Sequence, residues 1–213
     1  VRTPGGQPIY LALVYIDPGT YGTSCLSVGT GQYSVDYVSG YVNKYLKISK
    51  EGWDFEPPYY LISSSTGGNL TRNFTGTPTV TSGKAVTDSV QPNAWNYYSL
   101  QAPAGATEFT VDYEGSGQAG LAAQQGTWPT TTRQKLDLPA RLTVYHETLT
   151  INAASTPAFN TGKWFVGVNG LSASDYTLRV TLHSATIQPV ISGKVLRHDG
   201  TAYEGIIVRA DNP

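Results

Sequence analysis

The two ends of this chain share one pattern, and this constrains its fold more than any other feature. Residues 1–19 and 195–213 each read as an apolar start, a glycine turn, an apolar run and a closing aspartate. At an offset of 194 residues, without a gap, the identical pairs are Val1 with Val195, Gly6 with Gly200, Val14 with Val208, and Asp17 with Asp211. Self-similarity at a fixed long period indicates a repeat array. We therefore expect one period of a repeat, followed in residues 187–213 by the first strands of the next copy or by a donated tail.

The composition favours β-structure. The 213 residues include 23 Gly, 13 Pro and 15 Tyr, which suits short strands joined by turns. Charged residues make up 14% of the chain and the net charge is −1, so nothing suggests nucleic acid or an anionic membrane as a partner. Low charge with many Thr and Tyr residues fits an extracellular or cell-surface protein. The single cysteine, Cys25, excludes an intrachain disulfide and is expected to be a small buried residue.

Residues 1–78 form the first predicted unit. Its expected strands are residues 11–16, 32–37 and 41–49, with a last strand that ends at Thr77. In the second of these, alternation places Tyr33, Val35 and Tyr37 on one face. A tyrosine at every fourth position, from Tyr33 to Tyr45, also fits a helix, but Gly40 and the β-branched and aromatic content favour strands.

Four motifs in this unit occur in a recognisable order. They are G-x-Y at residues 31–33, G-Y-x-N-x-Y-L at 40–46, G-W-x-F-x-P at 52–57, and N-F-T-G-T at 73–77. This order resembles carboxypeptidase regulatory-like domains. The resemblance implies a seven-stranded immunoglobulin-like or prealbumin-like sandwich that opens with a strand of the form x-I-x-G-x-V. Such a strand does not precede Val1 in the sequence, and it is found at Val190–Val195.

Residues 79–186 form the second predicted unit, with turn-separated strands expected at residues 95–100, 108–113, 120–123, 142–151, 164–168 and 176–182. Its motifs Y-Y-S-L at 97–100, G-T-W-P-T at 126–130 and G-K-W-F-V-G-V at 162–168 resemble the bacterial pre-peptidase C-terminal domain, which implies a jelly-roll sandwich. The family's acidic stretch is replaced here by Gln118–Leu121, and residues 82–90 offer only Asp88, so calcium binding is not implied. The predicted fold is therefore all-β, with an immunoglobulin-like sandwich followed by a jelly-roll sandwich.

No catalytic motif accompanies this pattern. His146-Glu147 begins like a zinc-protease motif, but Thr150 stands where the second histidine is required. No nucleophile elbow or phosphate-binding loop is present. We predict no catalytic residues, no metal and no cofactor, and therefore not an enzyme. No apolar run approaches the ~18 residues of a membrane span.

Three surface positions are candidate recognition sites. Asn69 and Asn73 each begin an N-glycosylation sequon, and their spacing of four places both side chains on one face of a strand. Trp128, before Pro129 in an expected loop, is the candidate exposed aromatic that could stack on a sugar.

The leading functional hypothesis is a non-catalytic structural module of an extracellular repeat protein. A first sandwich without its opening strand would leave an open groove and unpaired backbone groups. That strand would come from another copy, giving a head-to-tail filament whose copies are continuous or separate. The predicted assembly residues are Val190, Ile191, Ser192, Gly193, Lys194 and Val195. The alternative is a carbohydrate- or substrate-binding accessory module of a secreted hydrolase or peptidase.

Overall fold

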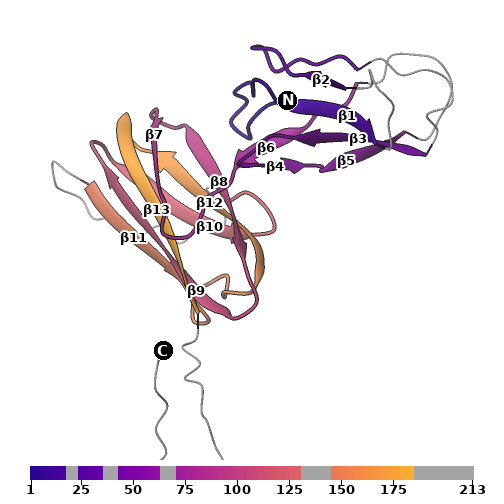
Figure 1. The fold of residues 1–213 in the computed structure, drawn as a ribbon. Helices are drawn as coiled ribbons and strands as arrows, with labels where there is room; N and C mark the ends of the chain where they lie inside the picture. Colours follow the sequence, from indigo (N-terminus) through magenta and orange to yellow (C-terminus); the bar gives the residue numbers. More distant parts are fainter. Residues whose placement is uncertain (18–23, 36–42, 63–70, 131–144, 185–213) are drawn as a thin grey trace, which may run out of the picture.

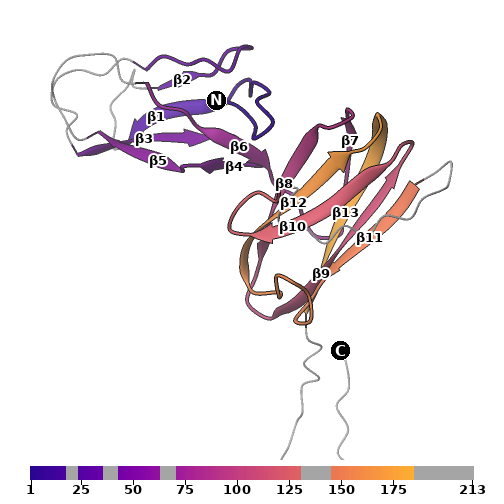
Figure 2. The ribbon, with the colours of Figure 1, turned by 180° about the vertical axis from the view of Figure 1, so that it is seen from behind.

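The computed structural model describes residues 1–17, 24–35, 43–62, 71–130 and 145–184. This part of the chain contains thirteen strands and no helix, which confirms the all-β prediction. Two bodies succeed each other along the chain, and each has its own hydrophobic cluster (Figures 1 and 2). We call residues 1–78 the N-terminal sheets and residues 79–184 the C-terminal sandwich. The predicted domain boundaries themselves stay predictions.

The N-terminal sheets contain six strands in the described residues. β1 (Leu13–Asp17), β2 (Ser24–Leu26), β3 (Lys44–Ser49) and β5 (Tyr59–Ile62) form an antiparallel sheet in the order β2-β1-β3-β5. β4 (Trp53–Glu56) and β6 (Thr75–Pro78) form a second, two-stranded sheet. The cluster between them consists of Val1, Ile9, Ala12, Val14, Ile48, Phe55 and Phe74.

The predicted strand at residues 32–37 is the main departure in this half. The described residues 32–35 belong to no strand, although Tyr33 and Val35 face inward and Gln32 and Ser34 are exposed, as the alternation predicted. The turn before this segment is closed by hydrogen bonds between Val28 and Gly31 and between Val28 and Gln32. The predicted strand at residues 41–49 begins at Lys44 within the described residues, because Asn43 takes a positive φ of 63° just before it.

The C-terminal sandwich consists of two antiparallel sheets. One has the order β10-β12-β8, formed by Ala119–Gln125, Gly162–Gly170 and Trp95–Ala102. The other has the order β11-β9-β13-β7, formed by Tyr145–Ile151, Ala106–Gly115, Ser174–Ser184 and Ala85–Val90. Each of the six strands predicted for this half overlaps one of these elements, and residues 142–144 of the predicted strand 142–151 lie outside the described residues. β7 was not predicted, because its sequence is short and mostly exposed.

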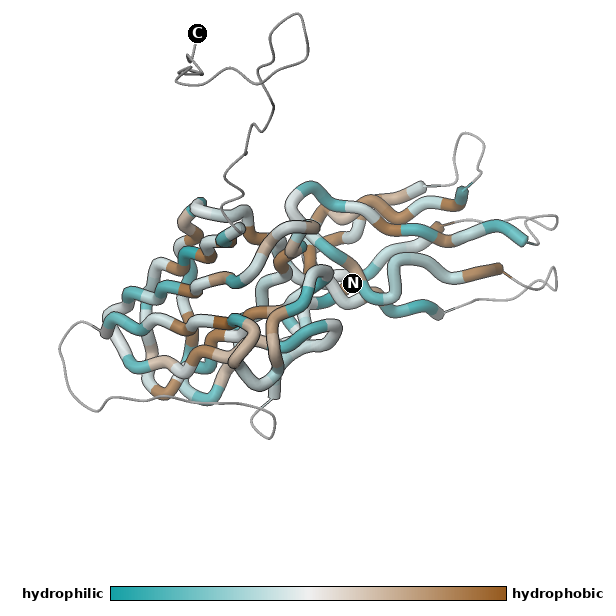
Figure 3. The backbone as a smooth tube through the Cα atoms, turned by 90° about the horizontal axis from the view of Figure 1, so that it is seen from below, coloured by the Kyte–Doolittle hydropathy of each residue, from teal (hydrophilic) through white to brown (hydrophobic). Residues whose placement is uncertain are grey.

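The core of the sandwich is built on large aromatic side chains. Trp164 is fully buried, with its ring 5.3 Å from Phe109 and 6.0 Å from Phe159 between centroids. Its indole Nε1 donates a 2.7 Å hydrogen bond to the carbonyl of Asn160, so the buried N–H group of this ring has a hydrogen-bond partner. Figure 3 shows the alternation of hydrophilic and hydrophobic residues along the strands, which lets one face of each sheet enter this core.

Replacement of Trp164 by alanine is expected to lower the free energy of unfolding by about 3–5 kcal/mol, because a fully buried indole is lost and a cavity remains. Leu171→Ala is the control, since this side chain is 43% exposed and should change the stability by less than about 0.5 kcal/mol. Urea unfolding followed by far-UV circular dichroism measures both. Equal stabilities of the two variants would contradict this account of the core.

Candidate functional site

A groove of about 850 Å³ opens at the start of the chain. Its lining comes from four short segments: Val1–Arg2, the part of residues 25–28 that includes Cys25, the segment Thr30–Ser34, and the segment Thr71–Phe74. We call it the Val1 groove. It lies within the N-terminal sheets, and residues far apart in sequence meet there.

The two long walls of the Val1 groove have the form of strands without being part of a sheet. Along residues 32–35 exposed and half-buried side chains alternate, and along residues 71–74 exposed side chains alternate with a half-buried Arg72 and a buried Phe74. Neither segment is assigned to a strand. Alternation of this kind is the pattern of an extended chain with one face toward a core.

Val1 and Arg2 lie between the two walls at one end of the groove. The Val1 nitrogen donates to the Gly31 carbonyl on one side, and the Arg2 nitrogen donates to the Phe74 carbonyl at 3.1 Å on the other. The Arg2 carbonyl in turn accepts from Gly76 at 2.8 Å, which makes Arg2 a parallel bridge partner of Thr75. On the other side Arg2 forms an antiparallel bridge with Pro8, and the Val1 carbonyl accepts from Ile9 at 3.1 Å, so these two residues are held between the segment at Pro8–Ile9 and the segment that leads into β6.

Two aromatic side chains line the groove, Tyr33 and Phe74, and their ring centroids lie 6.1 Å apart. Tyr60 lies outside the lining and contacts Phe74 with a centroid distance of 5.1 Å. The Tyr33 hydroxyl donates a 2.7 Å hydrogen bond to the Arg72 carbonyl on the opposite wall, so a whole tyrosine side chain spans the gap. Burial raises the pKa of Tyr33 to about 12. Burial also raises the pKa of the Cys25 thiol, which is half-buried and faces the same cluster.

The two bodies meet at a junction that includes Trp128. Its indole Nε1 donates to the Thr77 hydroxyl at 3.0 Å, and its ring lies 5.6 Å from Phe165. Lys163 reaches across the same junction to Glu56 at 3.2 Å and Asp54 at 3.6 Å. Trp128 is thus half-buried rather than freely exposed, because it links the last strand of the N-terminal sheets to the sandwich.

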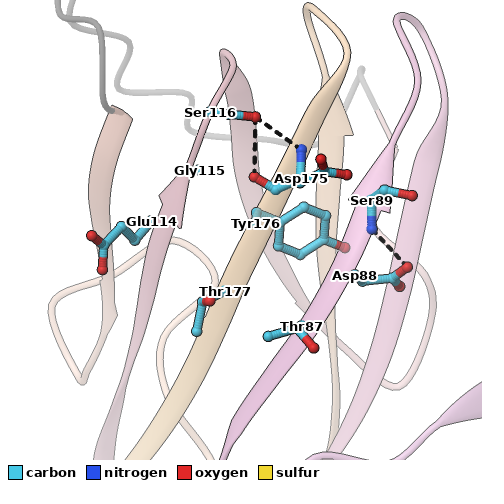
Figure 4. A pocket seen from close by; sticks show the side chains of 9 residues that line it. All are labelled: Thr87, Asp88, Ser89, Glu114, Gly115, Ser116, Asp175, Tyr176 and Thr177. Carbon is cyan, nitrogen blue, oxygen red and sulfur yellow. Dashed lines mark hydrogen bonds between the residues drawn. The ribbon is translucent and has the colours of Figure 1, made fainter.

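A second, open pocket lies on the C-terminal sandwich, over β7, β9 and β13 (Figure 4). Its acidic side chains are Asp88, Glu114 and Asp175, one from each strand, and all three are exposed. Figure 4 shows Glu114 and Asp88 on opposite sides of β13 rather than turned toward a common point. Within the described ranges, no group of three His, Cys, Asp or Glu side chains is placed to hold a metal ion.

A partly buried hydrogen-bond network extends inward from Asp88 and Tyr176, which line this pocket. The Tyr98 hydroxyl contacts the Asp88 carboxylate at 2.7 Å and the Tyr176 hydroxyl at 2.6 Å. The Asn96 side-chain nitrogen donates to the Tyr176 hydroxyl at 2.9 Å and to the Asp88 carboxylate at 3.2 Å. The network satisfies two buried hydroxyls and ties β8 to β7 and β13. It was not apparent from the sequence, because its members are far apart in the chain.

The other predicted site residues lie on exposed positions or outside the described part of the chain. Asn73 is exposed and lies just before β6, and its carbonyl accepts a 2.6 Å hydrogen bond from the Tyr60 hydroxyl. Asn69 and the assembly strand Val190–Val195 lie outside the described residues. The histidine of the His146-Glu147 pair is exposed on β11. No helix capable of crossing a membrane occurs in the part of the chain that the structure describes.

The tyrosine network predicts alkaline instability. Burial raises the pKa of Tyr98, and burial raises the pKa of Tyr176 to about 12. Because the folded state holds these protons more tightly than an unfolded chain with tyrosine pKa values near ~10, stability is full below about pH 10 and falls between about pH 10 and 12.

Melting temperature against pH from 7 to 12 tests this expectation. Tyr176→Phe removes one of the titrating groups, so its melting temperature should fall less steeply above pH 10. Tyr59→Phe is the matched control, because Tyr59 is 50% exposed and should leave the slope unchanged. An identical slope for all three proteins would show that the network does not control the alkaline transition.

Neither a protein-family model nor a curated protein matches this chain. Among solved structures, it is similar to the 1.0 Å crystal structure of the pre-peptidase C-terminal domain of a collagenase from Bacillus anthracis. The TM-score is 0.34 and the identity 11%, with 54% of this chain and 100% of that chain covered. We base the all-β assignment on the strands and registers of this chain, independently of that match.

Proposed function

We propose that this chain is a non-catalytic structural module of an extracellular repeat protein, and that copies assemble head-to-tail by β-strand complementation. The donated strand is Val190–Val195, and the recipient is the N-terminal part of another copy. The observation that carries the proposal is the position at which β13 ends.

β13 ends at the opposite end of the molecule from the N-terminal sheets, in both views (Figures 1 and 2). Its 11 residues span roughly 36 Å at ~3.3 Å per residue. From Ser184 to Val190 the chain has six residue steps, which cover at most about 20 Å when fully extended. Val190 therefore cannot return even to the start of β13, and a strand that begins there is available to a neighbour instead.

A contact between one end of a copy and the other end of the next is heterologous. Unless the rotation between copies closes a ring, such contacts produce an open filament. The match between residues 1–19 and 195–213 supports the same arrangement, because it places Val195 where Val1 stands in the next copy. Copies that are continuous in one polypeptide satisfy this placement directly. In separate subunits residues 195–213 would duplicate Val1–Gly19 of the recipient, so we favour the continuous arrangement.

Other features support a structural role outside the cell. The polar clusters of the C-terminal sandwich serve packing: the Tyr113 hydroxyl binds the Gly117 carbonyl and Ser174, and the exposed side of β9 pairs Asp112 with Thr148. Asn73, the sequon residue within the described part, is exposed and available to a glycan. The surface is made mostly of uncharged polar residues, as 14% charged residues require.

Deletion of Val190–Pro213 from the full chain is expected to abolish assembly, since it removes the donated strand. Deletion of Leu196–Pro213 alone is the matched control: it keeps Val190–Val195 and should still assemble. Size-exclusion chromatography with light scattering and negative-stain electron microscopy measure both. Fibres of normal length from the longer deletion, or a monomeric intact chain at all concentrations, would contradict the proposal and favour a monomeric accessory module.

A further inference from the structure

We propose that the outer face of the sheet β2-β1-β3-β5 is a lateral contact surface for a second copy of this chain, which packs the same face against it about a two-fold axis. We call this surface the Leu13 face. Its apolar side chains are those of Leu13, Leu26, Tyr45, Tyr59 and Leu61. The lateral contact goes beyond the proposed head-to-tail assembly and does not involve the donated strand.

The Leu13 face gathers most of the exposed apolar side chains of the described residues. Nine large hydrophobic residues are exposed in this part of the chain, and five of them lie on this face, each between 38% and 50% exposed. The strand registers place them side by side, because Leu13 pairs with Leu26 and Tyr45 pairs with Leu61. Alternate residues of the same strands, such as Val14 and Ile48, are buried in the N-terminal cluster. The sheet is therefore apolar on both sides, as in sheets that are covered on both faces.

The outward side of the sandwich sheet β11-β9-β13-β7 shows what this chain places in water. One row across its strands consists of Thr150, Thr110 and Thr181, and the next consists of Thr148, Asp112 and Arg179. Hydroxyl and charged groups thus cover an outer sheet face of the same chain. The apolar Leu13 face does not follow from the composition, and a contiguous exposed apolar patch of this kind indicates a binding partner.

The C-terminal sandwich of the same copy is not that partner. It contacts the N-terminal sheets through their other sheet, where Glu56 of β4 binds Lys163 and Thr77 of β6 binds Trp128. The Leu13 face belongs to the opposite layer of this body, and its side chains keep their exposure in the complete chain.

The charges of the Leu13 face favour a second copy as the partner. Lys47 and Asp17 are the charged side chains of this face, and they form an ion pair. One cation beside one anion gives no net charge for a nucleic acid or an anionic membrane to recognise. A two-fold axis that runs between them sets Lys47 of each copy opposite Asp17 of the other, so the face is complementary to itself.

The aromatic side chains favour a protein partner over a sugar. The rings of Tyr45 and Tyr59 lie edge to face, with centroids 5.0 Å apart and an interplanar angle of 78°. They therefore form no common flat surface on which a sugar ring stacks. Tyrosine with few charged residues is the composition of the centre of a protein–protein interface.

The size of the Leu13 face indicates a weak contact between two single copies. Four strands ~4.8 Å apart, with about five residues each at ~3.3 Å, cover roughly 300 Å² of flat sheet, below the about 800 Å² of accessible surface per partner in a stable interface. The face recurs in every copy of the proposed filament, so the contacts between two filaments add up. Only this strengthening along a filament rests on the proposed function.

Sedimentation equilibrium tests the lateral contact, in the intact chain and in the chain that lacks Val190–Pro213, where the head-to-tail contact is removed. We expect both to self-associate. Leu61→Lys should weaken the association of the shorter chain by more than about tenfold, because it buries a charge without a partner. Tyr59→Lys is a second variant on the same face. Leu171→Lys is the matched control, since Leu171 is 43% exposed on the C-terminal sandwich and lies outside the face.

Two outcomes overturn the lateral contact: a shorter chain that stays monomeric up to its solubility limit, and an association that neither Leu61→Lys nor Tyr59→Lys weakens. A glycan or another protein that binds the face of a monomeric chain overturns it as well. Negative-stain electron microscopy of the intact chain keeps this result separate from the proposed function. Leu61→Lys should leave single filaments in place of paired ones. A chain that forms no filaments but associates through the Leu13 face overturns the head-to-tail assembly and supports the lateral contact.

Discussion

The structure depends on the pairing of backbone N–H and C=O groups between extended segments, because a β-protein has no helix to satisfy these groups locally. In the C-terminal sandwich this requirement is met along whole strands: β13 pairs with β9 on one side and β7 on the other, over long registers. In the N-terminal sheets the strands are shorter, and side chains supply part of the bonding. The Ser27 hydroxyl, for example, donates to the Ile9 carbonyl and accepts from Ala12.

This difference explains why the two halves offer different surfaces. The sandwich encloses a cluster centred on fully buried rings, and its polar groups form closed networks such as that of Tyr98, Tyr176 and Asp88. The N-terminal cluster is smaller and is lined by half-buried residues, including Cys25, Tyr33 and Tyr60. Extended segments that belong to no sheet lie beside these half-buried aromatic side chains. An added strand would therefore bury more apolar surface and pair more backbone groups here than on a closed sandwich.

The sequence predicted the sandwich better than the N-terminal sheets for a physical reason. β9 and β13 alternate between buried and less buried residues, and β10 and β12 are nearly continuous buried runs, so their own side chains indicate strands in a large core. β7 is an edge strand with mostly exposed residues, and β2 has three residues. Neither sequence therefore shows enough hydrophobic alternation to predict a strand. The Val1 groove was not apparent from the sequence, because its sides meet through contacts such as Tyr33 with Arg72 that no local pattern encodes. Trp128 lies outside the strands, as expected, but its half-burial could not be predicted for the same reason: its partner Thr77 lies in another body.

The proposed assembly has two forms, continuous copies and separate subunits, and they give residues 196–213 different roles. In a continuous polypeptide, Val195 takes the place of Val1 and residues 196–213 become the next first strand. In separate subunits, residues 195–213 would duplicate residues 1–19 of the recipient, so only Val190–Lys194 would add new pairing. Covalent continuity raises the effective concentration of the strand at its groove, whereas separate subunits make occupancy depend on protein concentration. The proposed assembly therefore depends, in both arrangements, on the short segment Val190–Lys194 that precedes the matched residues.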